Sequence, residues 1–289
     1  MDIRSSLLMG LLIGLLMMVG YLVGGGSPYF VLVFFIMALL INLVVYWYSD
    51  SLVLKMYRAR ILGEAERPEL QAMVARLAAN AGIPKPKVAI VPSDVPNAFA
   101  TGRSPSSAAV AVTNGALNLL SRDELEGVLS HEITHIKNRD TLVMVLAAAI
   151  AGAIGYMAFW ARWSLLMGGS RRDEGGGNLI GLILVAVLVP LAAMIIRLAI
   201  SRGREYMADH GGATISGKPG ALADALEKIE GYVRRRPVQG GNPATAHLFI
   251  VNPFRGDALA SIFSTHPPTS ERVKRLRRLE KEQRIGKIF

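Results

Sequence analysis

The sequence predicts an α+β membrane protein with four transmembrane helices and a mainly helical polar domain that contains a small β-sheet. Two observations carry this prediction. Four long apolar runs occur in two pairs, and each run is long enough to cross a bilayer as a helix. The polar blocks that follow the pairs combine helical periodicity with short strand-like runs. The chain therefore divides into residues 1–50, 51–140, 141–200 and 201–289.

The first apolar pair lies in residues 5–49, which contain no Asp, Glu, Lys or Arg. A helical span takes about 20 apolar residues, so this stretch has room for two. Because a glycine-rich turn follows residue 23, we expect a hairpin of two spans, Leu7–Val23 and Tyr29–Tyr48. A cleaved signal peptide is the alternative for the first span, but its apolar region would be shorter.

The second pair consists of two charge-free runs, Thr141–Ala161 and Gly175–Ile196, joined by a polar, glycine-rich linker. The alternative is that both are core helices of a large soluble domain. Four spans would place both polar blocks on the same side of the membrane. Lysine and arginine residues flank the second and fourth runs, so we expect this side, with both termini, to be cytoplasmic.

The polar block before the third run shows one helix, two or three strands and a second helix. Apolar residues recur with helical spacing from Leu70 to Ala78, whereas Lys87–Val91 and Ala108–Val112 read as strands, with Asn97–Thr101 as a possible third. A capping-box pattern at 121–124 opens a helix that we expect to continue into the third apolar run.

The last polar block is expected to be helical at both ends. One helix continues the fourth run, another covers Ala221–Val233, and a basic helix, Ser270–Lys281, closes the block. Residues Arg234–His247 read as a loop.

Composition excludes several classes of protein. Hydrophobic residues make up 52% of the chain and charged residues 19%, which excludes a disordered protein. The absence of cysteine excludes a disulfide scaffold, a Cys-ligated metal site and a Cys nucleophile. The formal charge of +10 means that a nucleic-acid partner must be considered. No aromatic residues interleave the basic residues of the closing helix, so we expect no nucleic-acid partner.

The strongest chemical signal is the motif His131-Glu132-Ile133-Thr134-His135. Two histidines four positions apart on a helix share a face, so both imidazoles can reach one metal ion. Glu132 lies beside them and could take a proton from a water at that ion. Glu126 lies earlier on the same helix without an assigned role, and we expect its replacement to change little.

A third ligand is needed, because a catalytic zinc site has three protein ligands and one open position. No histidine follows at metzincin spacing, which leaves a carboxylate or one of three other histidines: His210, His247 and His266. Glu205 and Asp209 share a helix face just after the fourth run, at the membrane side where the histidine pair also lies.

We assign Glu205 as the third ligand and Asp209 as an acceptor for a ligand histidine N–H. A surface charge is the alternative for Asp209, and His210 is the rival third ligand. Imidazole and carboxylate ligands favour one zinc ion per chain.

Three motifs together resemble one family: HEITH at 131–135, REYMAD at 204–209 and THPPTSERVKRL at 265–276. With the four-span layout, they look like the HtpX-type membrane zinc metalloproteases, relatives of the CaaX prenyl endopeptidase. The resemblance implies a gluzincin catalytic domain on the cytoplasmic side of a bacterial cytoplasmic (inner) membrane. It also implies stress-related quality control, with misfolded or damaged membrane proteins or unfolded polypeptides as substrates and the lipid bilayer as surroundings.

The resemblance also implies roles for Asn97 and His266 in holding the substrate carbonyl or the oxyanion, with residues 97–102 as the edge strand to which substrate adds. From the sequence alone, Asn97 would be a turn residue and His266 a loop histidine. The competing function is a non-catalytic membrane protein that binds anionic lipid through the basic closing helix, whose solvated face is the simpler interpretation.

Overall fold

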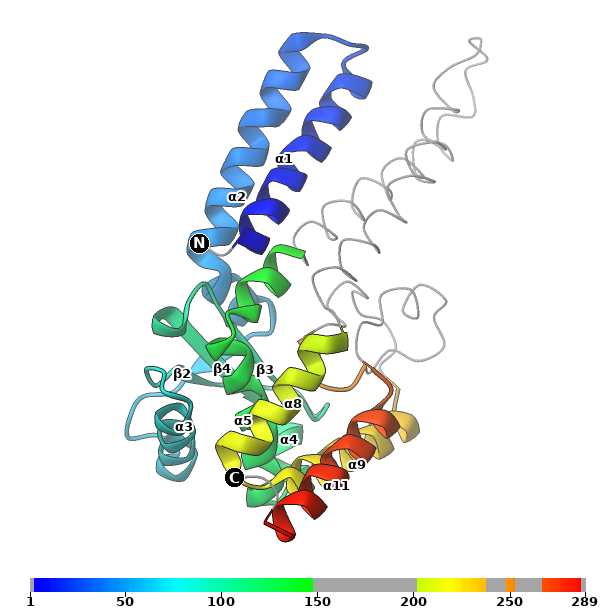
Figure 1. Ribbon diagram of the computed structural model, residues 1–289. Coiled ribbons are helices and arrows are strands. Elements are labelled where there is room, and N and C mark those ends of the chain that lie inside the picture. The colour runs from blue at the N-terminus through cyan, green and yellow to red at the C-terminus, as the bar shows by residue number, and fades with distance from the viewer. Residues whose placement is uncertain (1–2, 148–201, 238–247, 253–266, 287–289) are drawn as a thin grey trace.

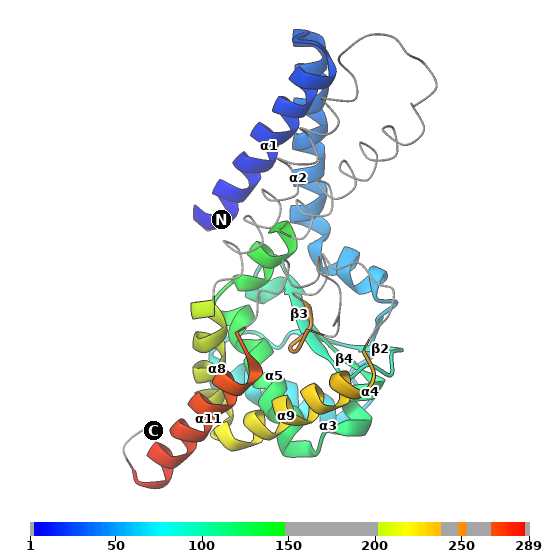
Figure 2. The same cartoon turned by 90° about the vertical axis from the view of Figure 1, so that its right-hand side faces the viewer.

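The structure is a computed structural model that describes residues 3–147, 202–237, 248–252 and 267–286. The fourth apolar run and all of the third beyond residue 147 lie outside the described residues, as do His247 and His266. In the described part, a helical hairpin projects from a domain built of a small sheet and helices, as both orientations show (Figures 1 and 2).

The hairpin consists of α1 (Ile3–Val23) and α2 (Pro28–Met56), which run antiparallel along their length (Figure 1). Glycine allows the close approach near the turn: a Cβ on Gly20 would lie 2.8 Å from Cβ of Phe34. Among the described residues, α2 alone is long and apolar enough to cross a membrane. The structure thus gives one candidate span in the described residues, and the four transmembrane helices stay a prediction.

The sheet has four strands in the order β1-β2-β4-β3, with β3 at one edge. The strands are β1 (Arg60–Ile61), β2 (Lys87–Val91), β3 (Ala98–Gly102) and β4 (Ala108–Thr113). β2 and β4 are parallel, while β1 and β3 pair antiparallel with their neighbours. The three strands expected from the sequence are confirmed within one residue at each end, and β1 was not predicted.

Both faces of the sheet are covered, which explains why every residue of β4 is buried. Alternate residues of a strand point to opposite faces. Ala109 and Ala111 belong to the apolar cluster around the base of the hairpin. Val110 and Val112 belong to the cluster formed with the helices of the domain. The sheet thus joins the hairpin base to the helical layer.

The helical layer contains five long helices and the short α4 (Asn114–Leu119), with a 3-10 turn at Pro105–Ser107, within the described ranges. The long helices are α3 (Pro68–Ala81), α5 (Arg122–Lys137), α8 (Arg202–Ser216), α9 (Pro219–Arg235) and α11 (Thr269–Arg284). The capping box that opens α5 is confirmed, because Ser121 and Glu124 exchange both hydrogen bonds. α9 extends past its predicted end, and most of the expected loop after it lies outside the described residues.

The expectation that α5 runs into the third apolar run was wrong. α5 ends at Lys137, and Arg139 adopts a left-handed conformation with φ of 59°. The chain is helical again at residues 140–147. A left-handed residue cannot continue a right-handed helix, so the axis changes here.

α5 and α8 pack closely because α8 carries adjacent glycines at the crossing. A Cβ on Gly212 would lie 2.9 Å from the backbone nitrogen of His131, and one on Gly211 would lie 2.5 Å from Cγ2 of Thr134. This contact brings Glu205, two turns earlier on α8, within reach of the histidine pair.

Glu126 does not behave as the sequence suggested. Its carboxylate is only 2% exposed and pairs with Arg76 at 2.9 Å and with Lys218 at 3.1 Å. These ion pairs tie α5 to α3 and to the start of α9. Because loss of a buried, paired carboxylate is destabilising, the structure argues against the expectation that its replacement would change little.

Candidate active site

Three ligand atoms converge where α5 faces α8. Nε2 of His131 lies 3.2 Å from Nε2 of His135 and 3.7 Å from Oε2 of Glu205. Nε2 of His135 lies 3.5 Å from Oε1 of Glu205. Donor atoms around a tetrahedral zinc ion with bonds near 2.0–2.1 Å lie about 3.3 Å apart. The spacing of these three side chains therefore fits zinc.

The charge of the surroundings also fits a divalent cation. Four carboxylates and two guanidinium groups are buried around the cluster. They belong to Glu132, Asp140, Glu205 and Asp209, and to Arg204 and Arg272. With neutral imidazoles this set carries a net charge of −2, which a dication would balance. Burial lowers the pKa of His135, but the carboxylates of Asp140 and Glu205 raise it to about 10, so the site favours positive charge.

Asp209 lies on the far side of the His131 ring. Its Oδ1 is 3.0 Å from Nδ1 of His131, and both oxygens accept hydrogen bonds from the guanidinium of Arg272 at 2.7 and 2.9 Å. Burial raises the pKa of Asp209, but the charge and hydrogen bonds of Arg272 prevail and lower it to about 2. Asp209 is therefore a buried, ionised carboxylate placed within hydrogen-bond distance of His131, and not a surface charge.

Arg272 was missed by the sequence analysis, which placed it on a basic helix face. The structure buries it to 1% exposure, where it also donates to the backbone oxygen of Ile250 at 2.9 Å. The available signal was its position among the apolar residues of α11. Leu276, one turn later, is buried on the same face.

Asp140 was also missed, because it follows the end of the motif helix. Its Oδ2 lies 3.1 Å from Nδ1 of His135, and both groups are buried. Each ligand histidine therefore has a carboxylate on its second ring nitrogen.

Glu132 lies between the histidine pair and the edge strand. Its Oε2 accepts a hydrogen bond from the backbone N–H of Ala100 in β3 at 2.9 Å. Burial raises the pKa of Glu132, the two imidazoles lower it, and the neighbouring Glu205 carboxylate raises it further, with a net rise. A raised pKa makes this carboxylate a better proton acceptor, which suits a general base.

The cavity at the cluster is small, about 20 Å³. Apart from the cluster and Glu132, its walls are apolar: Phe99, Ala100, Met144, Leu248, Phe249 and Ile250. This volume is enough for a water molecule but far too small for a peptide.

Asn97 lies beside this cavity, and its side-chain amide is held by hydrogen bonds to the neighbouring segment. Its amide donates to the backbone oxygen of Leu248 at 2.9 Å and accepts from the N–H of Ile250 at 3.0 Å. Both ends of the amide are thus used to hold residues 248–250. This arrangement favours a role in holding that segment over direct contact with substrate.

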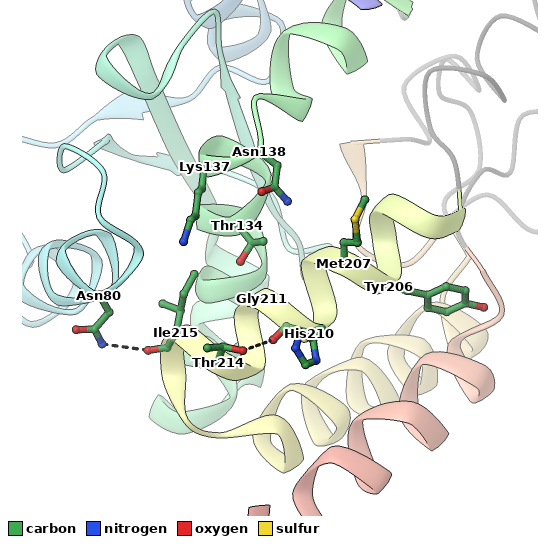
Figure 3. A pocket seen from close by; sticks show the side chains of 10 residues that line it. All are labelled: Asn80, Thr134, Lys137, Asn138, Tyr206, Met207, His210, Gly211, Thr214 and Ile215. Atoms are coloured by element: carbon green, nitrogen blue, oxygen red, sulfur yellow. Dashed lines mark hydrogen bonds between the residues drawn. The ribbon is translucent and has the colours of Figure 1, made fainter. Parts of the chain in front are cut away.

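The rival third ligand, His210, lies on another face of α8. Figure 3 shows it lining an outer cavity of about 720 Å³ with Tyr206, Met207 and Lys137. The described metal-binding cluster contains His131, His135 and Glu205 and does not include it. The proposed roles of His247 and His266 fall on residues outside the described ranges.

Comparison with known proteins places these residues in a family. A sequence profile of Peptidase family M48 matches residues 64–280. A "Protease HtpX homolog" of Thermococcus kodakarensis is 58% identical over 286 residues, covering 99% of this chain and 98% of the relative. A protein of the same description from Pyrococcus abyssi is 59% identical over 287 residues, with the same coverage. One from Aquifex aeolicus is 52% identical over 268 residues, covering 91% of this chain and 88% of the relative.

A solved structure agrees at the level of the fold. The crystal structure of S. mikatae Ste24p matches with a TM-score of 0.50 and 20% identity, over 91% of this chain and 61% of that chain. The profile covers most of the chain, and the relatives match it nearly end to end. The chain therefore belongs to peptidase family M48 and is a metalloprotease.

Proposed function

We propose that this protein is a membrane-embedded, zinc-dependent endopeptidase that cleaves misfolded or damaged membrane proteins on the cytoplasmic side of the cytoplasmic membrane, in stress-related quality control. The observation that carries the peptidase chemistry is the spacing of the ligand atoms of His131, His135 and Glu205, with Glu132 adjacent. The apolar hairpin next to the site supports membrane proteins as substrates.

The three ligands would hold one zinc ion, which when bound supplies Lewis acidity that polarises the scissile carbonyl and lowers the pKa of a water to about 7. Glu132 accepts the proton of that water at its carboxylate and delivers it to the leaving amine. Burial of Glu132 keeps bulk water away from this proton. Asp209, which is hydrogen-bonded to Arg272, holds His131 in place at its Nδ1 atom.

Substrate would add its backbone to β3, the edge strand of the sheet. In the structure the N–H of Ala100 is taken by Glu132, and residues 248–250 line the small cavity. Addition of a peptide to β3 would therefore require the Ala100 N–H to exchange its partner, and the cavity of about 20 Å³ would have to widen. The apolar walls favour substrates with apolar side chains at the cut. A contact of His266 with the oxyanion stays a prediction.

The lipid-binding alternative is not favoured. α11 lies at the end of the domain away from the hairpin (Figures 1 and 2). Several of its basic side chains are engaged within the protein: Arg275 pairs with Glu271, Arg278 with Glu282, and Arg277 with Asp224. Arg272 is buried and pairs with Asp209.

The test separates metal binding from proton transfer in the full-length protein in detergent. Glu132→Gln keeps the three ligands, so zinc should stay near one per chain while cleavage of an unfolded protein falls at least about 100-fold. Glu205→Ala leaves two ligands and should lose zinc. Glu69→Gln, an exposed change on α3, is the control and should match the parent. Full zinc and full activity in Glu205→Ala would contradict the proposal.

A further inference from the structure

Asp140 lies beside the metal cluster without being one of its ligands. Its Oδ2 is 3.1 Å from Nδ1 of His135, and its side chain is 4% exposed. His131 has the matching arrangement, with Oδ1 of Asp209 at 3.0 Å from its Nδ1. Both imidazoles therefore direct Nε2 to the cluster and Nδ1 to a carboxylate.

The contact depends on the break that follows α5. In a continuous α-helix, residues five positions apart point about 140° away from each other, so residue 140 could not reach residue 135. The left-handed turn at Arg139 ends the helix and brings Asp140 to the His135 ring. This conformation is unfavourable for a non-glycine residue. A buried hydrogen bond to a charged group can offset that cost.

Asp140 is held relative to two other parts of the site. Nε of Arg204, on α8, lies 3.9 Å from its Oδ1. The next residue, Thr141, donates its hydroxyl to the backbone oxygen of Gly102 in β3 at 2.7 Å. α8 carries Glu205, and β3 is the proposed substrate strand. These contacts hold Asp140 in place relative to α8 and β3, the two elements that must stay aligned with His135.

We propose that Asp140 is a positioning residue of the metal centre, which fixes the tautomer and the ring orientation of His135 by accepting its Nδ1–H. Carboxylate partners of this kind leave Nε2 as the metal-binding nitrogen and raise its basicity. The inference rests on the zinc site of the proposed function. It extends that site to the first residue of the helical segment 140–147, which leads into the third apolar run.

The test compares Asp140→Asn and Asp140→Ala in the full-length protein in detergent. Zinc affinity is measured by competition with a chromophoric chelator, folding by thermal unfolding, and kcat and KM with an unfolded protein. The matched control is Glu126→Gln, which removes charge from another buried, ion-paired carboxylate just before the same ligands.

Asp140→Ala should weaken zinc binding about 10–100-fold. Asp140→Asn keeps a hydrogen-bond acceptor without the charge, so its zinc affinity should lie between those of Asp140→Ala and the parent. With saturating zinc, kcat should fall while KM stays unchanged, because Asp140 is placed to act through His135. Glu126→Gln should unfold at a lower temperature but bind zinc like the parent.

A zinc affinity of Asp140→Asn within about twofold of the parent would overturn the inference, even where Asp140→Ala fails to fold. A drop in zinc affinity of the same size in Glu126→Gln would also overturn it, because the effect would then be general. Failure of the parent itself to bind zinc would instead overturn the proposed function, so the two failures are distinguishable.

Discussion

The buried pair between Arg272 and Asp209 gives a sharp test of how the site is held together. The change is Arg272→Met, which keeps the length of the side chain and removes its charge. Arg272 makes two hydrogen bonds to Asp209 and one to the backbone of Ile250, and all three would be lost. The Asp209 carboxylate, 4% exposed, would then be buried beside His131 without its guanidinium partner.

The expected loss of stability follows from this burial. Breaking a buried ion pair by removing one partner destabilises a protein by about 3–5 kcal/mol, because the remaining charge is desolvated without compensation. For a domain of this size each kcal/mol lowers Tm by about 2–4 °C, so we expect a fall of roughly 6–20 °C. Zinc affinity should also fall, because Asp209 orients His131.

The assay is thermal unfolding in detergent with a chelator present, so that metal binding does not contribute. Asp209→Asn combined with Arg272→Met removes both members of this ion pair and should regain most of the lost Tm. An unfolding temperature of Arg272→Met within about 2 °C of the parent, or losses that simply add in the double variant, would refute the reasoning.

Acid provides a second readout of the same pair. Since the pKa of Asp209 is lowered from 3.8 to about 2, its ionised form contributes stability that is fully present above pH 3.8. That contribution is lost as the pH falls toward 2. Arg272→Met should lose less stability than the parent across this interval, because the cause of the lowered pKa has been removed.

Two further predictions concern the segment over the cavity and the orientation in the membrane. Asn97→Ala removes the acceptor of the Ile250 N–H, so hydrogen exchange at that amide should speed up at least about tenfold, whereas an unchanged rate would mean that the segment is held elsewhere. A reporter at Phe289 and one inserted at Ser93 should both report the cytoplasm, and one within residues 175–177 should report the outside. Opposite sides for the first two would separate the proposed metal ligands.

Local patterns predicted much of the fold. The capping box that opens α5 and the runs that form β2 and β4 were predicted within one residue of their structural bounds, and the stripe of apolar residues on α3 within three. These signals depend on residues close in sequence, so contacts with distant parts of the chain do not change them. The spacing of His131 and His135 likewise needs only a helix to place both rings on one face.

The features that were missed depend on distant contacts. Arg272 reads as one of several basic residues until α11 packs against α8 and buries it next to Asp209. Glu126 reads as a surface carboxylate until Arg76 and Lys218 arrive from other helices. Asp140 lies beyond a left-handed residue that helical periodicity cannot anticipate. Charges of this kind acquire their partners only in the folded chain.

The ligands of the metal centre are distributed along the chain in a way that bears on biosynthesis. His131 and His135 precede residues 136–204, and Glu205 follows them. A growing chain is made from its N-terminus, so the histidine pair exists before the carboxylate does. Until α8 has been synthesised and its two glycines have closed on α5, the proposed centre lacks one of its three donors. With Glu205 as the proposed third ligand, the order of synthesis would delay proteolysis until the second apolar pair and the start of the last polar block have been made.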